Sequence, residues 1–257
     1  FRSELGLFCA TENFNVKTMK RLFLLLLLTS FYGIAQQQYV IEKDIHYYSD
    51  SLDKKDIYRD SQCTLDIYYP KNANNFATVV WFHGGGLTSG NKEIPTALLE
   101  KGFAVIGVGY RFSPKVKAPV YIEDAAAAIA WAFQHIGKYG GNTDLIFLSG
   151  HSAGGYLTMM VGLDKKYLSK YSIDANKIAG NIPFSGHTIT HFTVRKEKGM
   201  NDIQPLIDEY APLFFARPDA SPLVLITGDP ELELLGRYEE NAYMWRMMKL
   251  AGHKRTT

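Results

Sequence analysis

The stretch Leu145-Ile146-Phe147-Leu148-Ser149-Gly150-His151-Ser152-Ala153-Gly154-Gly155 decides the fold of this chain. Its first four residues form an apolar run that predicts a strand, and residues 156–163 continue as a buried helix. The hexapeptide between them matches Gly-x-Ser-x-Gly, a sharp turn that raises a serine above a strand end and at a helix start. Gly150 and Gly154 suit this turn because it packs so closely against neighbouring backbone that a side chain has no room. The stretch therefore predicts Ser152 as a nucleophile.

A second glycine-rich stretch, His83-Gly84-Gly85-Gly86, follows the apolar run at 77–82, which also predicts a buried strand. Glycines in a loop at a strand end expose backbone N–H groups, and such groups can bind the oxyanion that develops when a serine attacks a carbonyl. Both motifs come directly after a strand pattern, and they occur in this order. Together they predict a serine hydrolase.

Strand and helix patterns alternate along the chain from Gln36 onward. Strands are expected at 39–48, 63–69, 77–82, 103–108, 145–148, 178–184 and 223–227, and helices at 91–101, 124–139, 156–163 and 236–252. Short connections between alternating elements predict an α/β fold, with a mostly parallel central sheet and helices on both faces. A single domain over 36–257 accounts for this length.

The first 35 residues have a different character. Met19-Lys20-Arg21, the leucine-rich run and the small residues near Ala35 have the order of a secretory signal. Residues 1–35 are therefore expected to be a leader whose true start is Met19, and the protein is expected to be exported to the periplasm or secreted. An uncleaved anchor is the alternative, although the run is short for a membrane span. After cleavage no stable span is expected.

Charge and cysteine content argue against several other classes. The first 35 residues hold four of the 28 basic and two of the 26 acidic residues, so 24 of each remain and no nucleic-acid patch is expected. Cys63 is the only cysteine beyond the leader, and its place in an alternating strand pattern predicts a packed core residue. The sequence has no Cys/His cluster with metal-ligand spacing. Neither a metal nor a cofactor is expected.

The chain resembles the α/β-hydrolase esterases, particularly the carboxylesterase/hormone-sensitive-lipase-like and feruloyl-esterase-like (BD-FAE) branches. The resemblance runs from about Leu65 to about Gly252 and rests on both glycine motifs and on the stretches 107–114, 123–126 and 140–142. It implies ester cleavage through an acyl-serine intermediate, with an oxyanion hole made by the N–H groups of Gly85, Gly86 and Ala153. It also implies a small-molecule or carbohydrate ester as substrate, for example an acetyl or feruloyl ester.

The resemblance further implies an acid and a histidine that follow Ser152 in that order. After the strand at 223–227, the family pattern Gly-x-x-Asp selects Glu231, and Asp229 is the alternative if the turn is slipped by a residue or two. The family's histidine follows the last strand, and no strand is expected after His253. His187 and His191 precede the acid and break the order. We therefore expect the chain to be truncated before its catalytic histidine and inactive as it stands.

Two other functions stay open at this point. Arylformamidase-like amide hydrolases share the glycine loop and the serine turn, and activity on N-formylkynurenine rather than on acyl esters would distinguish them. A hydrolase fold without its histidine can also serve as a non-catalytic binding protein, and the missing base favours this for the chain as given.

Overall fold

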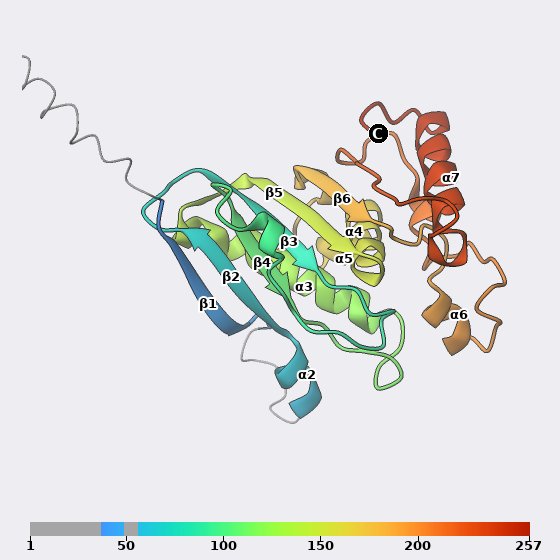
Figure 1. Cartoon of the computed structure of the whole chain (residues 1–257), viewed down its shortest axis with the longest axis horizontal. Coiled ribbons are helices and arrows are strands. Elements are labelled where there is room, and N and C mark those ends of the chain that lie inside the picture. The colour runs from blue at the N-terminus through green and yellow to red at the C-terminus, as the bar shows by residue number, and fades with distance from the viewer. Residues whose placement is uncertain (1–36, 49–55) are drawn as a thin grey trace, which may run out of the picture. The chain divides into compact units, whose positions relative to one another are not determined.

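The computed structural model describes residues 37–48 and 56–257 (Figure 1). The leader expected at 1–35, with the start at Met19, lies outside the described residues. Among the residues that are described, no helix is both long and apolar enough to cross a membrane.

Six strands form one sheet in the order β1-β2-β4-β3-β5-β6. β1 and β2, and β2 and β4, pair antiparallel, whereas β4, β3, β5 and β6 run parallel. The strands are β1 (Tyr39–His46), β2 (Thr64–Pro70), β3 (Phe76–Phe82), β4 (Ala104–Val108), β5 (Gly141–His151) and β6 (Gly180–Phe184). The expected mostly parallel sheet is confirmed. Because parallel strands end at the same edge, β3 and β5 deliver both glycine motifs to one place.

Helices α3 and α4 lie against one face of this sheet (Figure 1). The helices are α2 (Ile57–Gln62), α3 (Val120–His135), α4 (Ala153–Leu163), α5 (Lys166–Ser169), α6 (Phe192–Glu197) and α7 (Arg237–Leu250). Short 3-10 turns are η1 (Thr96–Leu98), η2 (Ile136–Tyr139), η3 (Ala175–Lys177), η4 (Pro212–Phe215) and η5 (Leu234–Gly236). Every residue of α4 is buried, and Cys63 is part of the core as expected. A helix buried all round fixes the serine turn at its start.

The other face of the sheet is crossed by an extended segment instead of the helix expected at 91–101. Trp81 Nε1 donates a hydrogen bond to Glu93 Oε1 at 3.2 Å, and a Cβ on Gly107, beside Trp81, would lie 2.2 Å from the Glu93 carbonyl oxygen. Pro95 explains the difference, because proline has no N–H for a helix interior and disfavours helical geometry in the residue before it. The expected helix is wrong, and only η1 forms.

Residues 223–226 extend the sheet beyond β6 through isolated bridges and form no regular strand. The backbone N–H groups of Val224 and Ile226 donate to β6 at 2.9 and 3.1 Å. On the far side, Thr257 N–H donates to the Leu223 carbonyl at 3.0 Å. The chain after His253, where no strand was expected, therefore pairs with this segment, and Thr256 lies parallel to Leu223.

Candidate active site

Ser152 occupies the sharp turn between β5 and α4 that its sequence motif predicts. Its backbone angles are φ 56° and ψ −113°, and its N–H donates to the Phe184 carbonyl at 2.8 Å. A Cβ on Gly154 would lie 1.9 Å from the Phe82 carbonyl oxygen, and one on Gly150 would lie 2.6 Å from the same atom. Only glycine fits at either position. A non-glycine residue held at positive φ is a form of strain that occurs at functional sites.

The glycine loop lies against this turn. A Cβ on Gly84 would lie 3.6 Å from Ser152 Cβ. Gly85 and Gly86 have φ values of 114° and 63°, in the region that favours glycine. No acceptor among the described residues takes the N–H of Gly85 or Gly86. The structure thus brings the loop and the serine together and leaves two amides free to bind an oxyanion.

His83 braces the loop from behind. Its ring stacks on Tyr110 with centroids 4.4 Å apart, and the Tyr110 hydroxyl donates to the His83 carbonyl at 2.8 Å. Its Nδ1 lies 2.6 Å from the Gly84 carbonyl oxygen. Burial lowers the pKa of His83, so the imidazole is neutral. It fixes the position of the oxyanion loop.

The two carboxylates predicted from the sequence lie in an exposed turn. Asp229 Oδ1 accepts the Glu231 N–H at 2.9 Å, and neither side chain contacts Ser152. The structure therefore does not bring Asp229 or Glu231 to Ser152, and their assignment as the acid stays a prediction.

Glu233, which the sequence analysis missed, folds back toward the site. Its Oε1 accepts from Gly228 N–H at 2.7 Å, Thr227 Oγ1 at 3.1 Å and Ser185 Oγ at 2.5 Å. Burial raises the pKa of this carboxyl, but the hydrogen bonds from Ser185, Gly228 and Thr227 outweigh it and hold the pKa below its ordinary value. Glu233 is therefore ionised at neutral pH.

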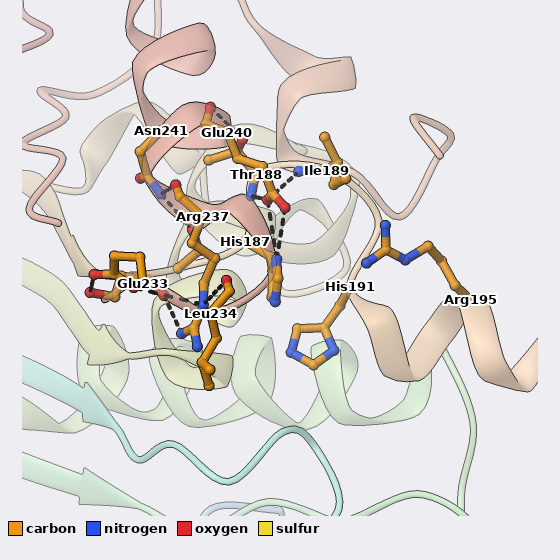
Figure 2. Close-up of polar contacts among 12 residues, drawn as sticks. His187, Thr188, Ile189, His191, Arg195, Glu233, Leu234, Arg237, Glu240 and Asn241 are labelled. Carbon is orange, nitrogen blue, oxygen red and sulfur yellow. Dashed lines mark hydrogen bonds and ion pairs between the residues drawn. The ribbon is translucent and has the colours of Figure 1, made fainter. Parts of the chain in front are cut away.

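Arg237 lies between this carboxylate and Ser152. Its Nη1 donates to Ser152 Oγ at 3.0 Å, and its Nε lies 3.9 Å from Glu233 Oε2 (Figure 2 shows Glu233 and Arg237 side by side). The sequence analysis did not single out this arginine either. One signal was available, because a basic residue at a helix start, after Gly236, opposes the helix dipole.

The histidines considered from the sequence all form hydrogen bonds with groups other than Ser152. His187 Nδ1 lies 3.1 Å from both carboxylate oxygens of Glu240, and His191 Nδ1 accepts the Thr193 N–H at 3.2 Å. His253 lies next to Thr256 and the Ala220 carbonyl. Within the described ranges no imidazole contacts Ser152.

The fold and the site define an α/β-hydrolase. Among solved structures, a truncated form of a carbohydrate esterase from gut microbiota matches with a TM-score of 0.69 and 20% identity, over 86% of this chain and 87% of that one. Esterase B from Lactobacillus rhamnosis matches with a TM-score of 0.65 and 19% identity, over 94% and 83%. At these identities the likeness concerns the fold.

Residues 65–250 match the BD-FAE family, and the chain belongs to it. The expected resemblance is confirmed. A curated relative, the probable carboxylic ester hydrolase LipM of Mycobacterium tuberculosis, is 31% identical over 174 residues, which are 60% of this chain. Lipase 2 of Moraxella sp. is 35% identical over 96 residues, which are 35% of this chain. The chain spans 39% and 22% of the lengths of these two relatives.

Proposed function

We propose that this protein hydrolyses carboxylic esters through a covalent acyl intermediate on Ser152. The observation that carries the proposal is the placement of Ser152 in its strained turn, next to a glycine loop whose Gly85 and Gly86 amides have no acceptor among the residues that the structure describes. Membership of the BD-FAE family and likeness to carboxylic ester hydrolases support it.

The reaction follows from this geometry. Ser152 Oγ attacks the ester carbonyl carbon, and the carbonyl oxygen becomes an anion that the N–H groups of Gly85, Gly86 and Ala153 bind. One such donor contributes about 10²- to 10³-fold to the rate in other hydrolases. The hydroxyl proton passes to a general base and then to the departing alcohol. Water next attacks the acyl-serine and releases the acid. The base is a histidine by family resemblance, and it is not among the described contacts of Ser152.

We also propose that the substrate is an acylated carbohydrate met outside the cytoplasm. The carbohydrate esterase among the structural neighbours supports a carbohydrate ester as the substrate. The signal-like leader at 1–35 supports export from the cytoplasm. N-terminal sequencing of the protein tests the proposal of export. A first residue at Gln36 supports export, whereas a chain that keeps Met19 and stays in the cell contradicts it.

The nucleophile is tested with Ser152→Ala in the whole protein. The variant should lose hydrolysis of p-nitrophenyl acetate and labelling by a fluorophosphonate, while its unfolding temperature stays close to that of the wild type. Ser169→Ala is the matched control, because Ser169 is exposed on α5 and its hydroxyl donates to the Lys166 carbonyl within the same short helix, at 2.8 Å. Hydrolysis by Ser152→Ala at the wild-type rate would falsify the proposal.

The acyl group of the substrate is identified by a second measurement. The release of acetate from acetylated oligosaccharides is compared with the release of ferulate from feruloylated oligosaccharides.

A further inference from the structure

Arg237 places a buried cation directly at the nucleophile. It is the first residue of α7 and only 6% exposed. Its Nη1 donates to Ser152 Oγ at 3.0 Å and to the Ser185 carbonyl at 2.8 Å, and its Nε donates to the Leu234 carbonyl at 3.2 Å. These bonds fix the plane of the guanidinium, so that one N–H points at the oxygen that would attack.

This placement breaks three local rules of stability. Burying a cation costs free energy, and a positive charge at the first turn of a helix is repelled by the helix dipole. The two residues before it, Leu235 and Gly236, have positive φ values of 56° and 74°. Natural sequences tolerate such conflicts mainly at functional sites. A functional role for Arg237 accounts for all three.

Other side chains of α7 hold the arginine in place. Glu240 Oε2 accepts the Thr188 N–H at 2.9 Å, and Asn241 Nδ2 donates to the Gly186 carbonyl at 2.8 Å. Both partners lie in the segment that follows β6, in which Figure 2 labels Thr188. This segment packs against the start of α4, because a Cβ on Gly186 would lie 2.8 Å from the carbonyl carbon of Gly155. Because α7 is tied to this segment one turn beyond Arg237, the backbone of Arg237 cannot move away from Ser152 without breaking buried hydrogen bonds.

We propose that Arg237 is a further catalytic residue of the ester hydrolysis proposed above, on which this inference rests. It donates to a lone pair of Oγ and leaves the hydroxyl proton free to pass to the base. As the O–H bond breaks and the Oγ electron pair forms the bond to the carbonyl carbon, the guanidinium stabilises negative charge on Oγ. In deacylation the C–Oγ bond breaks, the electron pair returns to Oγ beside the cation, and the base restores the proton.

Arg237 stays charged although its surroundings lower its pKa. Burial lowers the pKa of the guanidinium, and the carboxylates of Glu233 and Glu240 oppose that shift. An arginine side chain stays protonated in proteins. Glu233 approaches only the Nε side, at 3.9 Å, and leaves the Nη1 side to the nucleophile. A nearby cation that lowers the pKa of a hydroxyl is an established way to activate a nucleophile.

The test uses Arg237→Ala and Arg237→Lys in the whole protein, with Arg246→Ala as the matched control on the exposed side of the same helix. The rate of fluorophosphonate labelling of Ser152 and the rate of p-nitrophenyl acetate hydrolysis are measured. For Arg237→Ala we expect both rates to fall about 10²-fold. This is the lower end of the rate loss that follows the removal of one preorganised hydrogen-bond donor. Arg237→Lys should recover part of the loss. Millimolar guanidinium chloride should raise the rate of Arg237→Ala, whereas equal sodium chloride should not.

Three results would overturn the inference. Labelling of Arg237→Ala at the wild-type rate or faster would show that the contact does not help Ser152 react. A loss that neither lysine nor guanidinium recovers, together with a lower unfolding temperature, would assign Arg237 a structural role. An unlabelled wild-type protein would overturn the proposed function itself and this inference with it, and that result is distinguishable from the other two because no variant is needed to see it.

Discussion

At the scale of single residues, the identity of the acid depends on how one turn folds. The family spacing points to Glu231 or Asp229, but both side chains are exposed, and Glu233 folds back over Gly228 instead. A Cβ on Gly228 would lie 3.0 Å from Glu233 Oε1, so the glycine makes room for this carboxylate. A contact of a side chain with backbone five residues earlier has no signature in spacing, and the sequence could not reveal it.

Glu233→Gln tests this placement against the two sequence-based candidates. An acid that orients the histidine and stabilises its charged form contributes about 10⁴-fold to turnover in the best-studied triad. We therefore expect Glu233→Gln to lower kcat by about 10²-fold or more, and Glu231→Gln and Asp229→Asn to lower it much less. The measurement is kcat on p-nitrophenyl acetate at one pH for the three variants. A larger loss in Glu231→Gln or Asp229→Asn would return the role of the acid to that residue.

At the scale of elements, the sequence predicted a strand correctly where an apolar run was compatible only with a strand. The runs at 77–82 and 103–108 became β3 and β4 within one residue, because a short, continuous apolar run can bury itself as a parallel strand. The pattern at 91–101 had helical spacing too, but Pro95 overrode it. The strand expected at 223–227 formed only isolated bridges, and that outcome depends on its neighbours rather than on its own residues.

The junction of β3, β5 and α4 yields a prediction about stability. Gly154→Ala puts a Cβ 1.9 Å from the Phe82 carbonyl oxygen, and backbone there has little freedom to move. We expect the free energy of unfolding to fall by about 1–3 kcal/mol or more. Gly137→Ala is the control, because a Cβ there meets nothing within 4 Å. It should change stability by less than about 1 kcal/mol, in the stabilising direction. Urea denaturation of both variants checks this, and equal losses would contradict the close packing of the turn.

At the scale of the whole molecule, the site is assembled from segments far apart in the chain. Arg237 lies 85 positions from Ser152, and Glu240 lies 53 positions from His187. The sequence predicted the serine turn and the glycine loop, which the structure places next to each other, because each is a local motif. It did not predict the Arg237 and Glu240 contacts, because residues that are far apart in the sequence and meet only in the folded protein produce no periodic sequence pattern. A different buried group makes the stability of the entire fold depend on pH.

His191 carries the clearest part of that dependence. It is fully buried, and burial, followed by the electrostatic effect of the neighbouring His187, Arg237 and Arg195, holds its pKa well below the ordinary value. The unfolded chain binds a proton at this residue below about pH 6.5, whereas the folded chain does not, so the free energy of unfolding falls as the pH falls below that value. The contribution of this one group is about 1.4 kcal/mol per pH unit. Glu233 and Asp208, whose pKa values are lowered, lose their contributions only below about pH 4.

His191→Asn isolates this effect, because asparagine cannot titrate and its side-chain oxygen can still accept the Thr193 N–H at the start of α6. Urea denaturation at pH 7.5, 6.5 and 5.5 should show a steeper loss of stability in the wild type than in the variant. The difference between the two proteins should amount to about 1 kcal/mol between pH 6.5 and 5.5, because the unfolded histidine is only half protonated at pH 6.5, and the full slope of about 1.4 kcal/mol per pH unit applies only at lower pH. His83 is also buried with a lowered pKa, but it is present in both proteins and cancels in the comparison. Equal slopes would mean that His191 accepts a proton in the folded state, and the buried cluster would then have to open at mildly acidic pH.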